Sequence, residues 1–299
     1  KPAAVWTEAL PVGNGRLGAM VFGRADNELI QLNESSLWSG GPIANNVNPK
    51  SPDYLPQVRA ALFKGDYVLA NKLVKKMQGL YSESYMPLGD LHIKQNFNAV
   101  MPTAYYRDLN IQDAIATTNF IVNGVQFKRT VLVSAPDQVI VVRLTADKAK
   151  QLNITVSASS ILHFKNEMSG KDALTLRGKA PAHVDPSYFH DNKEPVIYTD
   201  TAGCRGMRFA LQVKAVTKDG TVSADTAGIH ISNASEIILY CTAATSFNGY
   251  DKCPDAQGKN EIAISKSVLQ KASAKTYAAV YAAHLADFHK YFKDRKSVV

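Results

Sequence analysis

The feature that most constrains the fold is a series of short segments in which apolar and polar residues alternate. Alternation with a period of two places the apolar side chains on one face of a β-strand, so each segment predicts a half-buried strand. Polar or glycine-containing turns separate the segments, and Asn123-Gly124 is the strongest hairpin signal among them. The predicted strands lie in residues 90–97, 117–135 (two strands), 138–146, 152–159, 173–180, 206–216, 228–233 and 236–245. So many short strands predict a large antiparallel β-sandwich.

A glycine-rich run near the start of the chain, LPVGNGRLGAMVFG at residues 10–23, contains the G-x-G-x-x-G pattern of dinucleotide-binding proteins. That pattern holds a phosphate only when it follows a strand and opens a helix. Here Pro11 precedes the glycines, and the residues after them alternate as two short strands with a turn at 23–27. The run therefore predicts a turn that feeds a β-hairpin.

Helical spacing is confined to two regions. Residues 55–77 predict two short helices separated by Gly65-Asp66, and residues 261–293, free of glycine and proline, predict one long helix or a helix pair. The sequence thus predicts a mainly β fold, a large antiparallel β-sandwich or super-sandwich over residues 1–257. A short helical insertion interrupts the sandwich, and a C-terminal linker helix occupies residues 258–299.

Composition excludes several classes of protein. The 299 residues are 45% apolar, which suits a buried core, and no apolar run reaches the roughly 18 residues of a membrane span. The net charge of +8 is scattered rather than clustered with aromatic residues, so we expect neither a nucleic-acid nor a membrane partner. The three cysteines, Cys204, Cys241 and Cys253, have no zinc-ligand spacing, and we expect no metal or cofactor. One disulfide is possible, with the pair left open.

Six motifs occur in a fixed order along residues 6–250 and together resemble one family. They are WTEALPVGNGRLGAMVFG, IQLNESSLWSGGP, SYMPLGDL, YYRDLNI, APAHVDPSY and GMRFA. This series resembles the N-terminal domain of glycoside hydrolase family 95, the inverting α-L-fucosidases. The resemblance implies an N-terminal β-sandwich, a helical linker, an (α/α)6 barrel and a C-terminal β domain.

In that family the catalytic acid and base belong to the barrel, for which this sequence has no corresponding residues. An inverting glycosidase needs two carboxyl groups roughly 6.5–9.5 Å apart with a water between them. The motif regions contain Glu34, Asp90, Asp108, Asp185 and Glu194, and nothing in the sequence pairs any two of them. We therefore assign no catalytic residue to this chain and expect it to be inactive alone.

The motif LNESSLWSGGP supports two interpretations. Asn33, Glu34 and Trp38 could form a loop that reaches the sugar site, where an indole face stacks on a pyranose ring. Alternatively, Trp38 fills the interface between sandwich and barrel while Asn33 and Glu34 hold the turn. The second interpretation is favoured because tryptophan usually serves packing.

The motif APAHVDPSY offers the same choice. His183, Asp185 and Tyr188 could line the rim of the sugar pocket, since two prolines fix an extended loop. Alternatively, His183 and Asp185 bond each other or the backbone. All six residues of the two motifs are candidates for the substrate rim or the domain interface.

The resemblance implies a role within a glycosidase that acts on fucosylated glycans, with the catalytic barrel as partner. The alternatives are a stand-alone carbohydrate-binding or interaction module and, less favoured, a phosphorylase-type sugar enzyme. Because fucosylated glycans are extracellular, we expect a periplasmic or extracellular location. The absence of an initiator methionine at Lys1 is compatible with signal removal.

Overall fold

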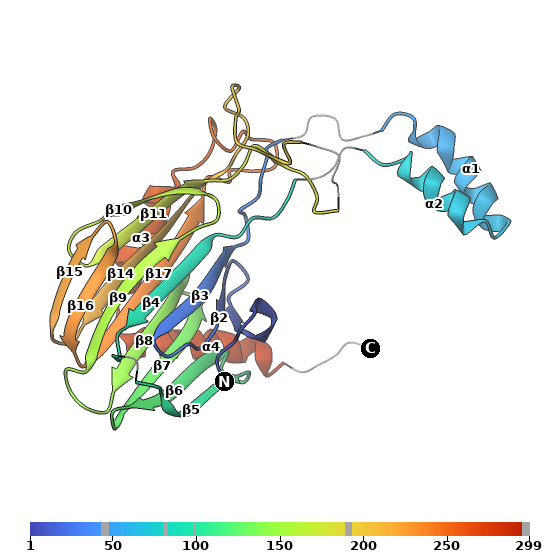
Figure 1. The fold of residues 1–299 in the computed structure, drawn as a ribbon. Coiled ribbons are helices and arrows are strands. Elements are labelled where there is room, and N and C mark those ends of the chain that lie inside the picture. The colour runs from blue at the N-terminus through green and yellow to red at the C-terminus, as the bar shows by residue number, and fades with distance from the viewer. Residues whose placement is uncertain (43–47, 80–82, 99, 189–192, 295–299) are drawn as a thin grey trace.

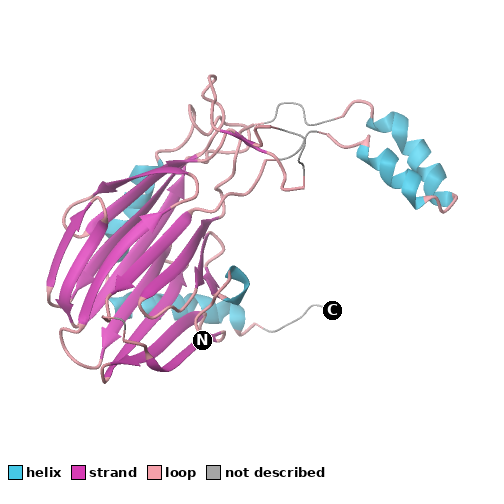
Figure 2. Ribbon diagram, in the orientation of Figure 1, coloured by secondary structure: helices cyan, strands magenta, loops and turns pink. Residues whose placement is uncertain are grey.

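The chain folds into two antiparallel β-sheets packed face to face, with helices at the periphery (Figures 1 and 2). A computed structural model describes residues 1–42, 48–79, 83–98, 100–188 and 193–294. The predicted antiparallel β-sandwich is confirmed. A short 3-10 helix, Trp6–Glu8, precedes the first strand.

One sheet has seven strands, in the spatial order β1-β2-β3-β4-β9-β16-β15. Its strands are β1 (Leu10–Gly13), β2 (Leu17–Val21), β3 (Asn27–Glu34), β4 (Gly89–Gln95), β9 (Leu152–Ser159), β16 (Gly228–Ala234) and β15 (Thr221–Asp225). The glycine-rich run forms the β1–β2 hairpin, and β2 and β3 are the two strands predicted after it. No helix starts there, so the run has no helix N-terminus to hold a phosphate.

The other sheet has eight strands, in the order β10-β11-β14-β17-β8-β7-β6-β5. Its strands are β10 (His163–Met168), β11 (Ala173–Lys179), β14 (Arg208–Thr217), β17 (Glu236–Thr245), β8 (Val139–Ala146), β7 (Val125–Ser134), β6 (Ile115–Val122) and β5 (Thr103–Asn110). The hairpin predicted at Asn123-Gly124 joins β6 to β7, and both residues have positive φ, 51° and 67°. A two-residue turn of that hand matches the twist of the strands.

Six strands were not anticipated from the sequence: β1, β5, β10, β15 and the two-residue strands β12 (His183–Val184) and β13 (Val196–Ile197). Pro11 lies inside β1, which pairs with β2 alone, and proline is tolerated there because an edge strand leaves one row of N–H groups unpaired. The strands β5, β10 and β15 are also sheet edges. Strands β12 and β13 form a separate small pair.

The core lies between the two sheets and consists of inward-facing aliphatic and phenylalanine side chains from both. Within it, Arg129 of β7 donates to Glu28 of β3 over 2.5 Å, with 3% and 0% of the two side chains exposed. Glu28 also accepts backbone N–H bonds from Gly23 and Arg24. Because each charge is neutralised by the other, the pair can be buried.

The predicted helical insertion is a hairpin of α1 (Ser51–Phe63) and α2 (Tyr67–Lys75). The break falls at Gly65-Asp66 as predicted, and the Asp66 carboxylate caps α2 by accepting from the N–H of Leu69. The two helices pack on each other through a small apolar cluster. Figure 1 shows the hairpin projecting away from the sandwich at the end where many loops gather.

The C-terminal region is a helix pair, α3 (Glu261–Ser273) and α4 (Tyr277–Phe292), the second of the two predicted possibilities. Thr276 starts α4 by accepting from the N–H of Ala279. Both helices lie on the outer face of the eight-stranded sheet, where Leu269 and Val280 pack on it. The sheet thus covers the apolar face of the pair.

The boundary after residue 257 stays a prediction. In the part of the chain that the structure describes, no helix is long and apolar enough to cross a membrane.

Candidate functional site

The predicted site residues map to the loop-rich end of the sandwich, from which the helical hairpin also projects (Figure 1). Four loops are tied together there by backbone hydrogen bonds. Ser39 donates to Ser84 over 2.9 Å, Gly40 to Pro181 over 2.9 Å, and Gly206 to Gly40 over 2.9 Å. Segments that lie far apart in the sequence therefore meet in one place.

The glycine pair in LNESSLWSGGP is explained by how closely these loops approach. Gly40 has a φ of +73°, and a Cβ atom there would meet the side chain of Glu83. A Cβ on Gly41 would lie 2.1 Å from the carbonyl oxygen of Cys204. Larger residues at either position would push the loops apart.

A disulfide between Cys204 and Cys253 adds a covalent brace to two of the loops. The two cysteines are 49 residues apart in the sequence, and the third cysteine, Cys241, is buried and free. The sequence alone had left this pairing open. The brace restricts how far the 203–207 and 249–257 segments can separate.

Glu34 and Asn33 lie at the end of β3, where the strand leads into the loop. Glu34 is buried and accepts from the N–H and hydroxyl of Ser36 (2.7 and 2.6 Å) and from Arg16 (3.2 Å). Arg16 belongs to the glycine-rich run and also donates to the carbonyl of Ala243 over 2.8 Å. These bonds fix the turn before Trp38. Asn33 is half-buried, opposite Gly18 of β2.

Trp38 is 43% exposed and stands edge-on to Tyr85, with ring centroids 5.6 Å apart. Its indole N–H donates to the carbonyl of Ser35 over 3.3 Å. Burial, aided by the neighbouring Glu34, raises the pKa of Tyr85, whose hydroxyl donates to the Glu34 carbonyl. The indole is thus held in one orientation with much of its surface open.

Trp38 lines a pocket of about 480 Å³ together with Glu83, Phe247 and Tyr250. Phe247 and Tyr250 are exposed, and both come from the loop after β17. The pocket therefore combines aromatic faces, which stack on apolar ring faces, with a carboxylate that accepts hydroxyl hydrogen bonds. That chemistry suits a polyhydroxylated ligand.

His183 and Asp185 lie beside this pocket and contact each other. The Nε2 atom of His183 is 2.8 Å from Asp185 Oδ1, and its Nδ1 atom is 3.4 Å from Glu83 Oε1. The bond to Asp185 is the main reason why the pKa of His183 is raised, with Glu83 adding to it. Ser39 donates to Glu83 over 2.8 Å, and Arg205 is 4.0 Å from it. The imidazole of His183 thus lies between two carboxylates.

Tyr188 is 71% exposed and follows Asp185 on the same loop. Sequence analysis missed Glu83, Tyr85, Arg205, Phe247 and Tyr250, although Tyr85 belongs to the SYMPLGDL motif. Of the other carboxylates, Asp90 accepts from Gln31 within the seven-stranded sheet, and Asp108 lies in β5. Within the described ranges, no three potential metal ligands are grouped.

The fold defines a class, the domains built from two antiparallel β-sheets packed as a sandwich. A solved structure titled a candidate kojibiose phosphorylase from the human microbiome aligns over 98% of this chain, with a TM-score of 0.52 and 11% identity. The alignment covers 37% of that structure, and it establishes the shared fold.

The family model described as "Glycosyl hydrolase family 65, N-terminal domain" matches residues 1–250. The chain belongs to this family of glycosyl hydrolase N-terminal domains. "Alpha-L-fucosidase 2" of Arabidopsis thaliana is 30% identical over 97% of the chain, and "Probable alpha-fucosidase A" of Aspergillus niger is 26% identical over 96%. The chain spans 35% of the length of each of these two relatives. The expected kinship with fucosidases is confirmed at this level.

Proposed function

We propose that this chain is the N-terminal β-sandwich portion of an inverting, family 95 α-L-fucosidase that acts on fucosylated glycans. The observation that carries the proposal is the 30% identity to "Alpha-L-fucosidase 2" over 97% of the chain. The chain spans 35% of that relative, and the proposal assigns the acid and base to a catalytic barrel outside these residues. The sandwich supports that barrel and contributes to the rim of its sugar site.

The loop-end pocket is the part of the sandwich that we assign to the rim. L-Fucose is a 6-deoxy sugar, so one edge of its ring carries a methyl group and the rest carries hydroxyls. The indole of Trp38 and the rings of Phe247 and Tyr250 suit the apolar edge. Glu83, which lines the pocket and is contacted by His183, supplies an acceptor for the hydroxyls.

The disulfide supports the proposed periplasmic or extracellular location. Disulfides such as Cys204–Cys253 form and persist in oxidising compartments and are rare in reducing ones. Fucosylated glycans are found in the same compartments.

The test measures two properties of the purified 299-residue chain. We expect no release of L-fucose from 2′-fucosyllactose, since the proposal assigns the acid and base to residues outside this chain. In a Trp6→Phe variant, Trp38 is the one remaining tryptophan, because the sequence contains two. We expect its fluorescence to change with 2′-fucosyllactose and less with lactose, the matched probe without fucose.

The two measurements test the location of catalysis and the rim assignment separately. Release of fucose above the blank would show that the barrel is dispensable and that catalysis lies within this chain. A Trp38 signal that is unaffected by either sugar would remove the rim assignment. Tight binding by the isolated chain would instead favour the stand-alone carbohydrate-binding module, for which the exposed rings of Trp38, Phe247 and Tyr250 argue.

A further inference from the structure

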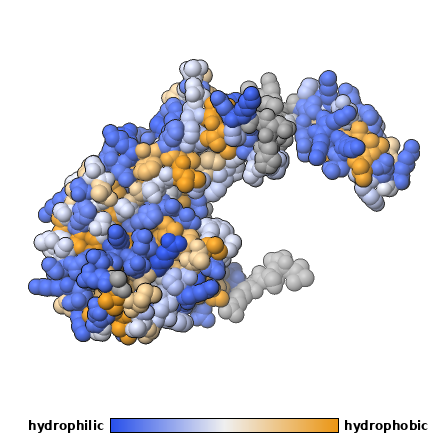
Figure 3. Space-filling view, in the orientation of Figure 1, coloured by the Kyte–Doolittle hydropathy of each residue, from blue (hydrophilic) through white to orange (hydrophobic). Residues whose placement is uncertain are grey.

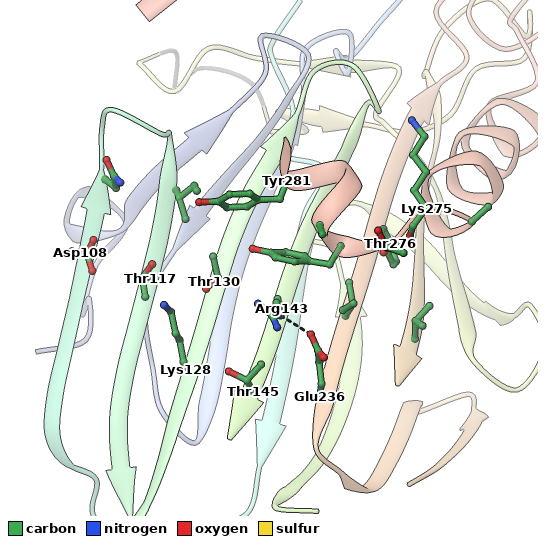
Figure 4. Close-up of a pocket in the computed structure, with 18 residues that line it drawn as sticks. Asp108, Thr117, Lys128, Thr130, Arg143, Thr145, Glu236, Lys275, Thr276 and Tyr281 are labelled. Carbon is green, nitrogen blue, oxygen red and sulfur yellow. Dashed lines mark hydrogen bonds and ion pairs between the residues drawn. The ribbon is translucent and has the colours of Figure 1, made fainter. Parts of the chain in front are cut away.

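A large groove lies away from the loop end, on the outer face of the eight-stranded sheet (Figure 4). Its volume is about 930 Å³, within the range of about 300–1,000 Å³ that is common for ligand sites. Strands β5 to β8 and β17 form its floor, and the start of α4, held by the turn that follows α3, forms its wall. None of the six predicted site residues lines it.

The floor carries polar side chains in two rows that cross the strands. Neighbours across antiparallel strands point to the same face, so each row is continuous. The rows are Asp108–Thr117–Thr130–Arg143 and Lys128–Thr145–Glu236. Figure 4 shows these side chains standing side by side on the sheet. Exposure to solvent alone explains polar side chains on a sheet, but it does not explain why two tyrosines stand beside them.

The wall consists of Tyr277 and Tyr281, one helical turn apart on α4 with ring centroids at 5.7 Å. The Arg143 guanidinium stacks 4.7 Å from the centre of the Tyr277 ring and is bonded to Glu236 over 2.6 Å. Burial raises the pKa of Tyr277 to about 12, so its hydroxyl stays protonated. Tyr281 extends from the helix across the sheet, beside the row that holds Thr117 and Thr130, and also packs against the apolar cluster under the helices (Figure 4).

The turn that carries the wall is itself fixed. The hydroxyl of Tyr240 donates to the carbonyl of Lys275 over 3.0 Å, and the side chain of Lys275 is bonded to Asp137. Thr276 caps the first turn of α4. The wall and floor are therefore already in place without a ligand, which reduces the entropy lost on binding.

The charges of the groove identify the kind of ligand. Lys128 and Arg143 are balanced by Asp108 and Glu236, and the fifth charged side chain of the lining, Lys275, is paired with Asp137 outside it, so the site has no excess charge for an anion or a cation. Threonine hydroxyls both donate and accept, and tyrosine rings stack on the apolar faces of sugar rings. We propose that this groove is a second saccharide-binding site, which holds a stretch of a neutral oligosaccharide. This site requires neither the barrel nor the loop-end pocket.

The test uses the 299-residue chain with ¹³C-labelled threonine methyl groups. The probes are 2′-fucosyllactose and cellotetraose, both neutral. We expect either or both to shift the methyl signals of Thr117, Thr130 and Thr145. The signal of Thr245, which bonds Ser36 at the loop end, serves as the internal reference for the other pocket.

Two variants separate binding from folding. Tyr281→Ala should weaken binding about tenfold, because a stacking ring is lost, whereas Tyr281→Phe keeps the ring and should change affinity little. Lys128→Ala removes an exposed side chain that the fold does not need, and it should weaken binding about threefold. Trp38→Ala should leave the affinity of this groove unchanged.

The proposal is overturned if millimolar concentrations of both sugars leave the three methyl signals unmoved. It is equally overturned if Tyr281→Ala and Lys128→Ala bind as well as the wild type. Shifts confined to Thr245, together with a Trp38 fluorescence change, would support the loop-end pocket alone and reject the second site. Shifts at the three methyls without fluorescence change would support the second site while the rim assignment fails.

Discussion

The sandwich and the helical hairpin α1–α2 differ in how much apolar surface they bury. The sandwich closes one continuous apolar core between two sheets and even buries an ion pair in it. The hairpin buries only Val58, Ala61, Ala70 and Leu73 between its helices. At its tip Phe63 is 90% exposed, beside exposed Tyr67 and Val68. Figure 3 shows apolar surface on the hairpin.

The sandwich therefore buries its own apolar side chains, whereas the hairpin leaves several of its apolar side chains exposed. Contacts between residues far apart in the sequence hold the sandwich, so damage to its core should reach the whole domain. The hairpin is held by neighbours in the sequence, so changes in it should stay local.

Arg129→Met should have the largest effect, lowering the free energy of unfolding by about 3–5 kcal/mol, because it leaves Glu28 buried without its partner. Urea unfolding measures the change. The matched control is Arg177→Met, which breaks an exposed pair with Glu167 and should cost less than about 1 kcal/mol. Equal losses in the two variants would contradict a buried, structural ion pair.

Replacing both Cys204 and Cys253 by serine should lower the free energy of unfolding by about 2–4 kcal/mol. Hydrogen exchange should locate the added opening in the loop end and leave β14 and β17 protected. Burial raises the pKa of the Cys241 thiol to about 12, so alkylation of the native chain should label no cysteine. Labelling before unfolding would show that the disulfide is absent.

The cluster at the loop end should depend on pH through His183, whose pKa is raised chiefly by Asp185. Its stabilising contribution is complete below the unfolded pKa of about 6.5 and is lost as pH rises through the higher folded pKa. The gain should be below about 1 kcal/mol, since the side chain is partly exposed. NMR titration of the ring should give a value above 6.5 in the wild type and a lower one in Asp185→Asn.

Phe63→Ser should have the smallest effect, within about 0.5 kcal/mol, because the ring makes little contact in this chain. Leu73→Ala, by contrast, should unfold the hairpin while the main thermal transition of the sandwich keeps its midpoint. Circular dichroism follows the helical loss, and the near-ultraviolet signal follows the sandwich. A common shift of both transitions would mean that the hairpin and sandwich unfold as one unit.

Sequence reasoning found the interior strands of both sheets and missed all four edge strands, β1, β5, β10 and β15. An interior strand is covered on its inner face, so its side chains must alternate, as in β9 and β6. An edge strand borders solvent, and its sequence is less constrained: β10 has no fully buried residue and β1 tolerates Pro11.

The candidate site was predictable only in part. The motifs drew attention to Trp38, His183 and Asp185, because each stands beside turn-forming prolines, glycines or polar residues. Glu83 and Arg205 carried no such signal, since a charged residue in a loop is ordinarily solvated. The roles assigned to all of these residues remain predictions.

Neighbours along the chain decide the Asn123-Gly124 turn, the break at Gly65-Asp66 and which interior strands are half-buried, so these features can be predicted from the sequence. The pairing of the cysteines, the contact of Glu83 with His183 and the position of two α4 tyrosines beside a polar sheet depend on tertiary packing. Local patterns reflect the short-range preferences of each residue. Contacts across 49 or 100 residues depend on how the two sheets pack, which no single segment encodes.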